Sequence, residues 1–244
     1  MNSQETIVLA DAHLDGFNAE LDCFIAFLAE LRQHAVHALF MLGDLCNIWL
    51  GTPKMHLPYQ EDLITAFHDL RDAGIQLNYV EGNRDYFLRR RYLNNPFHNI
   101  ASDFLQEQIG NTRVYFSHGD SVNLHDKPYR AWRAFSRNRL VFSVFNALPR
   151  SGLVRLVHLL ERTFRDTNTR HKTVFPLGTC QRYAERLWEE GFDCIVLGHF
   201  HERHHVRPLG EDSSKVLYTL PAWKDSHAYL CFSPEGTPVF RHFS

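Results

Sequence analysis

The stretch that decides the fold is Cys194–Gly198 (CIVLG), an apolar run that leads directly into His199, Phe200 and His201. A short, continuous apolar run of this kind predicts a buried strand. A strand of an open α/β sheet ends at the rim where ligands bind. Two His residues on one short turn therefore indicate a pair of metal ligands, and the remaining ligands are expected to follow other strands.

Four other predicted strands end in similar short polar tips. In chain order the strands and tips are Thr6–Ala10 with Asp11 and His13, Ala38–Leu42 with Gly43 and Asp44, Gln76–Val80 with Gly82 and Asn83, and Arg113–Phe116 with His118 and Gly119. Apolar residues recur every three or four positions from Phe17 to Leu31 and again from Leu63 to Leu70, which predicts helices between the first three strands. Alternating strands and helices predict parallel βαβ units, whose polar tips meet at one edge.

The rest of the chain predicts a helical insertion followed by short strands. About fifty residues of helical character run from about His125 to Lys172. Short strands are expected at Val216–Leu220, Ala228–Phe232 and Pro238–Phe243. This order predicts an α/β fold of two packed sheets with helices outside. We expect one domain over residues 1–244, with the helical insertion, or cap, at about 125–172.

The composition is that of an ordinary globular protein, with 44% hydrophobic and 22% charged residues. Five Cys residues without a CxxC pair argue against a disulfide framework and favour a reducing compartment. The first residues, MNSQETIVLAD, lack the pattern of a signal peptide, and no apolar run approaches the ~20 residues of a membrane-spanning helix. Sixteen His residues are the one unusual count.

The polar tips together supply two carboxylates, one amide and four imidazoles. These candidate ligands are Asp11, His13, Asp44, Asn83, His118, His199 and His201. Mixed imidazole and carboxylate ligands suit Mn²⁺, Zn²⁺ or Fe²⁺ better than Ca²⁺ or Mg²⁺. Seven ligands exceed the need of one ion and suit two ions, roughly 3.5–4 Å apart, that share a bridging carboxylate. Such a pair activates water toward a phosphoryl group, and the absence of a G-x-S-x-G elbow and of a P-loop agrees with this prediction.

Each tip has a plainer interpretation when it is taken alone. Asp-x-His is commonly a helix cap, and Gly-Asp or Gly-Asn after a strand is commonly a turn. Five such tips in one order, each after an apolar strand, are far more specific. Arg84 follows Asn83 directly; because arginine stays protonated, it can make a bidentate contact with a phosphate but cannot act as an acid or base. The alternative for Arg84 is a surface residue at the start of a helix.

The predicted cap combines positive charge with apolar residues. Residues 125–172 contain eleven Lys and Arg against three acidic residues, interleaved with aromatic and aliphatic side chains such as Trp132, Phe135 and Phe142. This combination predicts a helix that meets an anionic and apolar object. The alternative is a helical subdomain whose apolar face packs on the sheets and whose Arg residues are solvated.

The order Asp-x-His, Gly-Asp, Gly-Asn-Arg-Asp, His-Gly-Asp and Gly-His-x-His, from about Ile7 to His201, resembles the calcineurin-like metallophosphoesterases. The resemblance implies a four-layer αββα metallophosphoesterase sandwich with a helical cap insertion. It also implies that Asp11, His13, Asp44 and His201 hold one ion, and that Asp44 bridges to a second ion held by Asn83, His118 and His199.

Within that superfamily the chain resembles the UDP-2,3-diacylglucosamine hydrolases of Gram-negative lipid A synthesis. The motif GNRDYFL, Trp49 in GDLCNIW, and Asp126 and Tyr129 at the start of the cap carry this resemblance. It implies hydrolysis at the α-phosphorus to UMP and 2,3-diacylglucosamine 1-phosphate, with two Mn²⁺ as cofactors and a cap that binds the acyl chains. Asn47 departs from the family, which usually has an acidic residue there, and the segment DTNTRHK aligns loosely.

The same resemblance implies roles for individual residues and a location. Arg84, Asn83 and His118 are expected to be catalytic, and the expected substrate-binding residues are Asn83, Arg84, Asp126, Tyr129, Lys172 and His199. The expected partners are a lipid-linked UDP-sugar and an anionic membrane surface on the cytoplasmic face of the inner membrane. A nucleic acid is not an expected partner, and the oligomeric state is open.

Two other functions stay open at this point. A related enzyme could use the same metals on a soluble nucleotide or other phosphodiester, with the basic cap gripping phosphates. A non-catalytic scaffold could keep the fold and bind partners through the cap, although a scaffold has no need of seven ligands. The clusters Arg89–Arg91 and His204–His205 are expected to be exposed, with no role assigned.

Overall fold

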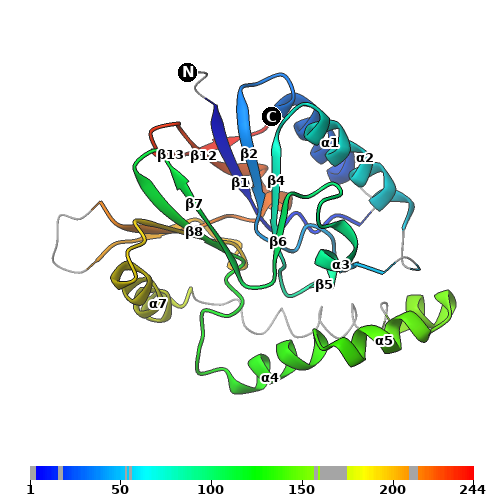
Figure 1. Ribbon diagram of the computed structural model, residues 1–244. Helices are drawn as coiled ribbons and strands as arrows, with labels where there is room; N and C mark the ends of the chain where they lie inside the picture. Colours follow the sequence, from blue (N-terminus) through cyan, green and yellow to red (C-terminus); the bar gives the residue numbers. More distant parts are fainter. Residues whose placement is uncertain are drawn as a thin grey trace.

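A computed structural model describes residues 4–15, 19–52, 54, 57–156, 159, 175–208 and 214–244. Two β-sheets pack face to face, helices lie on their outer faces, and the cap helices cross beneath one end of the strands (Figure 1). This arrangement confirms the predicted α/β sandwich with helices outside.

The first sheet has six strands in the order β13-β12-β1-β2-β4-β6. Strands β1, β2, β4 and β6 are parallel, whereas β12 is antiparallel to β1 and β13 to β12. The bounds are β1 Glu5–Leu9, β2 Val36–Met41, β4 Gln76–Val80, β6 Asn99–Ala101, β12 Ala228–Phe232 and β13 Pro238–His242. The parallel central strands bring the residues after β1, β2 and β4 to one edge.

The second sheet has five strands in the order β10-β11-β9-β8-β7. Strands β8, β9 and β11 are parallel, and β7 and β10 flank them as antiparallel edge strands. The bounds are β7 Phe104–Ile109, β8 Thr112–Ser117, β9 Cys194–Leu197, β10 His204–Val206 and β11 Val216–Thr219. The residues after β8 and β9 therefore leave the second sheet at its own carboxyl edge.

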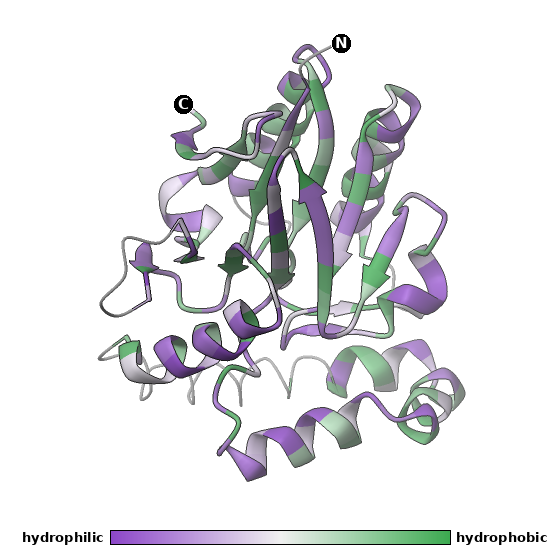
Figure 2. Ribbon diagram, turned by 60° about the vertical axis from the view of Figure 1, so that its left-hand side comes forward, coloured by the Kyte–Doolittle hydropathy of each residue, from purple (hydrophilic) through white to green (hydrophobic). Residues whose placement is uncertain are grey.

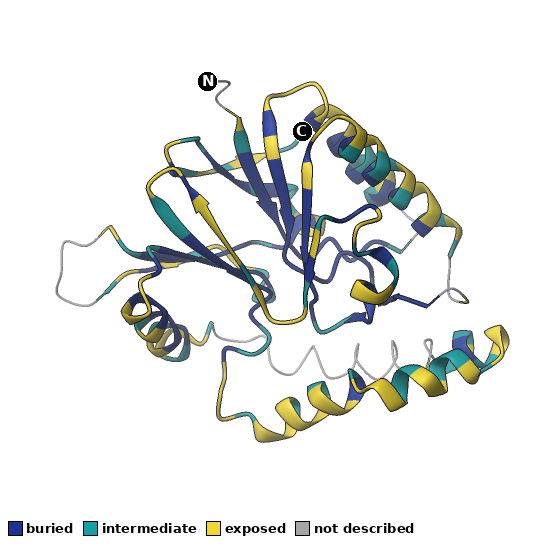
Figure 3. Cartoon of the chain, viewed as in Figure 1, coloured by how far each residue is buried: buried dark blue, intermediate teal, exposed yellow. Residues whose placement is uncertain are grey.

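Alternation of side chains along the strands builds separate apolar layers. On β1, Ile7 and Leu9 face the core beneath α1 (Ala19–Leu31) and α2 (Pro58–Asp72), whereas Val8 and Ala10 face the second sheet. A third core joins the second sheet to α7 (Leu177–Glu189). In Figure 2 the strands are rich in green apolar residues, and in Figure 3 they are largely dark blue. These layers form the αββα order that the family resemblance implies.

The sequence-based elements differ from the structure mainly at the edges. Strand β7 was not predicted; it is an edge strand with several exposed side chains, so it carries little apolar signal. The short β6 and the two-residue pair β3 (Trp49–Leu50) and β5 (Asp85–Tyr86) were also not predicted. Trp49 is fully buried in the first core and donates to the hydroxyl of Tyr92 at 3.4 Å.

The cap comprises α4 (Lys127–Ser136), α5 (Arg139–Ala147) and helical residues 150–156. The helices α4 and α5 carry much exposed surface (Figure 3). The cap packs through a small core in which Phe87 contacts Phe142 of α5 at a ring separation of 4.9 Å and Leu153 is fully buried. The end of the expected cap, including Lys172, lies outside the described residues. Among the described helices, none is both long enough and apolar enough to cross a bilayer.

Candidate metal centre and substrate cleft

Five of the seven candidate ligands have left-handed backbone conformations. Asp11, His13 and Asp44 follow β1 and β2 with φ values of 57°, 46° and 53°, and His199 and His201 follow β9 with 69° and 60°. Non-glycine residues rarely adopt this conformation, and such strain gathers at functional sites. The strand ends therefore turn sharply and present their side chains at the rim of both sheets.

Two glycines let the loops approach backbone to backbone. A Cβ added to Gly43, which has φ +81°, would lie 2.5 Å from the Gly82 nitrogen and 2.8 Å from His118 Nδ1. A Cβ added to Gly198 would lie 2.7 Å from the Ala10 Cβ. The loops after β2, β4 and β9 are thus in direct contact with their neighbours, which brings the ligands of distant strands together.

The first group of ligands joins the ends of β1 and β9. His201 Nε2 lies 3.2 Å from Asp11 Oδ1 and 3.3 Å from His13 Nε2, and His13 Nε2 lies 3.7 Å from the same carboxylate oxygen. The second carboxylate oxygen of Asp11 accepts a hydrogen bond from the His199 backbone nitrogen at 2.7 Å. Asp11 is therefore fixed by the loop that supplies the histidines.

The second group of ligands surrounds Asn83. Its Oδ1 lies 3.0 Å from His118 Nε2 and 3.1 Å from His199 Nδ1. The Nδ1 of His118 lies 2.7 Å from the Leu42 carbonyl, which indicates that this nitrogen carries the proton and that Nε2 is free to bind a cation. Asp44 lies between the groups, with its Oδ1 3.8 Å from His118 Nε2. The structure therefore brings all seven predicted ligands into one cluster.

The electrostatics of this cluster follow from buried carboxylates and imidazoles. Burial opposes the ionised form of Asp11, but the hydrogen bond from His201 and the nearby imidazoles hold its pKa well below the ordinary value. Burial likewise disfavours the charged form of His118, yet the carboxylates of Asp44 and Asp11 raise its pKa to about 9. For His199, burial and the charge of His118 lower the pKa to about 4. The buried carboxylates thus favour a positive charge at this position, which a bound divalent cation can supply.

The donor set fits divalent cations. Asp11, His13 and His201 offer ligand atoms within 4.8 Å of one another, as do Asp11, Asp44 and His118. The buried Nδ1 of His13 has no hydrogen-bond partner among the described residues. Several nitrogen and oxygen lone pairs face each other across a few ångströms, an arrangement that a cation satisfies better than a single proton. Divalent metal binding is the chemistry that this cluster supports.

Two buried carboxylates next to the ligands were quoted in the motifs but received no role from the sequence. Asp85 Oδ2 accepts hydrogen bonds from the backbone nitrogens of Asp44 and Gly82, at 2.9 and 2.8 Å, and from the Tyr79 hydroxyl at 2.9 Å. It therefore fastens the loop after β2 to the loop after β4. The signal was the final Asp of Gly-Asn-Arg-Asp, whose partners only the fold reveals.

Asp120, the second of these carboxylates, fastens the cap to the rim. It accepts hydrogen bonds from the Tyr129 hydroxyl and, at 3.0 Å, from Arg133 Nε, both on α4. Asp126 is the N-cap of α4, because its carboxylate accepts from the Tyr129 backbone nitrogen at 2.9 Å. Asp126 and Tyr129 therefore hold the cap in place as well as facing the cleft, and their predicted contact with substrate stays a prediction.

Arg84 is positioned beside the ligands. Its backbone nitrogen donates to Asp44 Oδ1 at 2.9 Å, and its Nε lies 3.6 Å from Asp44 Oδ2 without a hydrogen-bond partner among the described residues. One guanidinium nitrogen contacts the Asn47 carbonyl at 3.4 Å. Since Asn47 uses its backbone here, its departure from the expected acidic side chain leaves this contact intact. The mostly buried guanidinium is thus held beside the cluster of candidate ligands.

A cleft of about 850 Å³ runs over the cluster. Its lining includes Asn83, His199 and His201, several residues of α4, and residues near α7 and α8 (Trp223–Ser226). Of the residues predicted to bind substrate, Asn83, Asp126, Tyr129 and His199 line this cleft, and Lys172 lies outside the described residues. Arg84 is beside the cleft through its contacts with Asp44.

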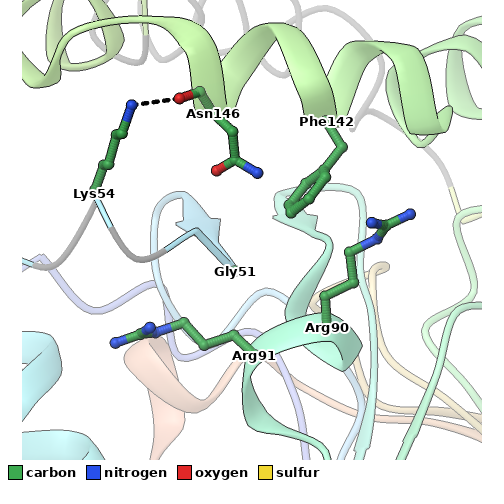
Figure 4. Close-up of a pocket in the computed structure, with 6 residues that line it drawn as sticks. All are labelled: Gly51, Lys54, Arg90, Arg91, Phe142 and Asn146. Carbon is green, nitrogen blue, oxygen red and sulfur yellow. Dashed lines mark hydrogen bonds between the residues drawn. The ribbon is translucent and has the colours of Figure 1, made fainter.

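A second cavity of about 460 Å³ lies between the cap and α3 (Leu88–Tyr92), and Figure 4 shows its lining. Arg90 stacks over the Phe142 ring at 4.2 Å, and Lys54 donates to the Asn146 carbonyl at the end of α5. Arg89 and Arg90 are exposed as predicted, whereas Arg91 is half-buried. The His204–His205 pair also differs from the prediction, because His204 is half-buried, contacts Glu202 at 2.9 Å and stacks on Phe175.

No protein-family model matches the chain. The chain is similar to the UDP-2,3-diacylglucosamine hydrolase of Stutzerimonas stutzeri, with 30% identity over 215 residues that cover 86% of this chain and 88% of that protein. The enzyme of the same name from Chromohalobacter salexigens is 28% identical over 244 residues, covering 98% and 97% of the two chains. The one from Photobacterium profundum is 25% identical over 235 residues, covering 95% and 94%.

Among solved structures, Vacuolar Protein Sorting 29 from Cryptosporidium parvum aligns over 100% of both chains. The TM-score is 0.50 and the sequence identity is 13%. At that identity the likeness concerns the fold alone, and it agrees with the two-sheet sandwich described above.

Proposed function

The chain belongs to the UDP-2,3-diacylglucosamine hydrolase family, and from this premise we propose that it cleaves the diphosphate of UDP-2,3-diacylglucosamine in lipid A biosynthesis. The products are UMP and 2,3-diacylglucosamine 1-phosphate. The observation that carries the proposal is the convergence of Asp11, Asp44, Asn83 and His118 under a basic cap that carries apolar side chains.

We propose two Mn²⁺ ions as the cofactors, with Asp44 as the shared ligand. Asp11, His13 and His201 would complete the coordination of one ion, and Asn83, His118 and His199 that of the other. When bound, such a pair polarises the phosphoryl group and stabilises charge on the attacking and leaving oxygens. The mixed oxygen and nitrogen donors support a transition metal over Ca²⁺ or Mg²⁺.

The chain's own residues bind and orient the diphosphate. Arg84 carries a permanent charge beside Asp44, and its free Nε can donate to a phosphate oxygen. The role that we propose for Arg84 is to stabilise negative charge on the phosphate, not to transfer a proton. The backbone bond from Arg84 to Asp44 holds the guanidinium and the metal ligand in one fixed relation.

The cap supports a lipid substrate. Trp132, Phe135, Leu140 and Val144 are exposed on α4 and α5, in a segment whose Lys and Arg outnumber its acidic residues. We propose that the cap receives the acyl chains and docks on anionic lipid at the cytoplasmic face of the inner membrane. In this proposal residues 1–244 act as one domain, with the cap as its insertion at about 125–172.

Hydrolysis by the purified full chain tests the function. The wild type is expected to release UMP from UDP-2,3-diacylglucosamine in the presence of Mn²⁺, and Asp44→Asn is expected to abolish release while the far-UV spectrum stays that of the wild type. The comparison substrates are UDP-glucosamine, which lacks the acyl chains, and bis(p-nitrophenyl) phosphate. Equal turnover of the lipid and these soluble compounds would favour a general phosphodiesterase and contradict the proposal.

A further inference from the structure

The cleft over the metal-ligand cluster has two chemically different walls. One wall belongs to the cap. Trp132 and Arg133 of α4, and Arg137 at the C-terminal end of this helix, line the cleft there. The other wall belongs to the sandwich, where Lys224 and Asp225 of α8 lie in the lining together with a group from the segments around β9 and α7. That group consists of Phe175, Phe200 and Glu202.

The two walls are attached to different sides of the cluster. On the cap side, Arg137 donates to the Gly82 carbonyl, next to Asn83, and Arg133 binds Asp120, near His118. On the α8 side, the Trp223 backbone nitrogen donates to the Ala10 carbonyl at 3.1 Å, next to Asp11. A substrate whose diphosphate lies on the cluster therefore has one half toward the cap and the other toward α8.

The α8 wall has the chemistry of a nucleotide site. Lys224 is exposed and lines the cleft that runs over the cluster. In the part of the chain that the structure describes, no carboxylate lies within ion-pair distance of Lys224. Its ammonium group is thus available to a phosphate that lies between it and the first group of ligands.

An aromatic face and two carboxylates complete this wall. Phe200 is half-buried between its neighbours: its ring lies 5.3 Å from Phe175 and 5.5 Å from His199. A fixed aromatic face can stack on a nucleobase whatever hydrogen-bonding groups the base carries. Asp225 is exposed and Glu202 is held by His204 at 2.9 Å, so both carboxylates can accept from ribose hydroxyls.

We propose that Lys224, Asp225, Phe200 and Glu202 bind the nucleoside monophosphate half of the substrate, with Lys224 on its phosphate and Asp225 on its ribose. This inference rests on the proposed function, because it places the two halves of a nucleotide-linked lipid on either side of one metal cluster. The cap wall suits the lipid half, because its helices carry exposed apolar side chains such as Trp132 and Phe135 among basic ones. The leaving 1-phosphate then faces the cap and UMP faces α8.

Binding of UMP to the metal-loaded full chain tests the inference, since UMP is both the proposed product and a soluble probe. Calorimetry would compare UMP, uridine and inorganic phosphate on the wild type, Lys224→Ala, Lys224→Arg and Asp225→Asn. We expect Lys224→Ala to weaken the binding of UMP about tenfold or more, and Lys224→Arg to recover most of the affinity. Asp225→Asn should weaken UMP and uridine alike and leave inorganic phosphate unchanged.

Trp132→Ala on the cap wall is the matched control. This variant is expected to keep the UMP affinity of the wild type and to bind 2,3-diacylglucosamine 1-phosphate more weakly, whereas Lys224→Ala should show the reverse. Metal analysis of each variant would verify that the ions are retained. If Trp132→Ala weakened UMP while Lys224→Ala did not, the nucleotide would lie under the cap and the inference would be wrong. If UMP bound as expected but UDP-2,3-diacylglucosamine were not cleaved, the proposed function would fail while the nucleotide site stood.

Discussion

The Nε2 atoms of His13 and His201 lie 3.3 Å apart, although 188 positions separate the two residues in the chain. Both nitrogens also face the Asp11 carboxylate, at 3.7 and 3.2 Å. Both backbones are in the left-handed region, so the fold holds this contact against local strain. Two ring nitrogens and a carboxylate aimed at one point form an arrangement that a cation stabilises.

Substitution of His201 should therefore reduce the amount of bound metal more than it reduces the stability of the fold. His201→Ala is expected to lower the bound divalent metal relative to the wild type, as measured by elemental analysis after gel filtration. Chelation should lower the melting temperature of the wild type, because an ion at about 100 times its Kd adds about 2.7 kcal/mol to the stability of the folded state. His205→Ala is the control, since His205 is exposed on β10. Equal metal content in the two variants would contradict the assignment of His201 as a ligand.

The contact between Gly43 and Gly82 gives a second prediction. Gly43→Ala should destabilise the protein and abolish hydrolysis, because the new Cβ would lie 2.5 Å from the Gly82 nitrogen and 2.8 Å from His118 Nδ1. Gly74→Ala is a matched control, since Gly74 has a similar φ of +88° but has no atom within 4 Å of the added Cβ. Gly74→Ala should cost only about 1 kcal/mol of backbone strain and keep full activity. Urea unfolding and the UMP-release assay measure both effects.

Asp85 provides a third prediction, which concerns the hydrogen bonds that join the loop after β2 to the loop after β4. Asp85→Ala leaves three donors without their acceptor: the Asp44 nitrogen, the Gly82 nitrogen and the Tyr79 hydroxyl. Burying unpaired donors costs roughly 1–3 kcal/mol each, so a loss of about 3 kcal/mol or more is expected in the free energy of unfolding. Tyr79→Phe removes one of the three bonds and should cost about 1 kcal/mol. A smaller loss in Asp85→Ala than in Tyr79→Phe would show that Asp85 does not join the two loops.

The ligand cluster could be predicted from the sequence because its signals are local. Each ligand follows a strongly apolar strand, as Asp11 follows β1 and His199 follows β9, and parallel strands bring such ends to one rim. The partners of Asp85 and Asp120 could not be predicted, because each carboxylate bonds to groups on other elements. No spacing rule relates Asp120 to Arg133 of α4, and only the docked cap brings them together.

The elements at the edges of the fold also could not be predicted from the sequence. Strand β7 pairs along its whole length with β8, but most of its side chains are not buried, so alternation does not reveal it. The α8 wall of the cleft was missed for a related reason. Lys224 and Asp225 sit on a four-residue helix that has no periodicity. Its place next to Asp11 is set by the backbone hydrogen bond from Trp223 to Ala10 and by the packing of the buried Trp223 ring on Phe24 and Phe27.

The exposed apolar residues of the cap give the last prediction, which tests membrane docking. Val144 on α5 is 58% exposed and Val239 on β13 is 53% exposed, so the two residues match in type and accessibility but differ in location. Val144→Asp should weaken sedimentation with vesicles that contain anionic phospholipid, because it removes apolar area and adds a charge that the lipid repels. Val239→Asp should leave sedimentation unchanged. Both variants should keep the thermal stability of the wild type, since neither side chain is in a core. Equal loss in both variants would indicate a general effect of charge, and no loss in Val144→Asp would remove α5 from the membrane-facing surface.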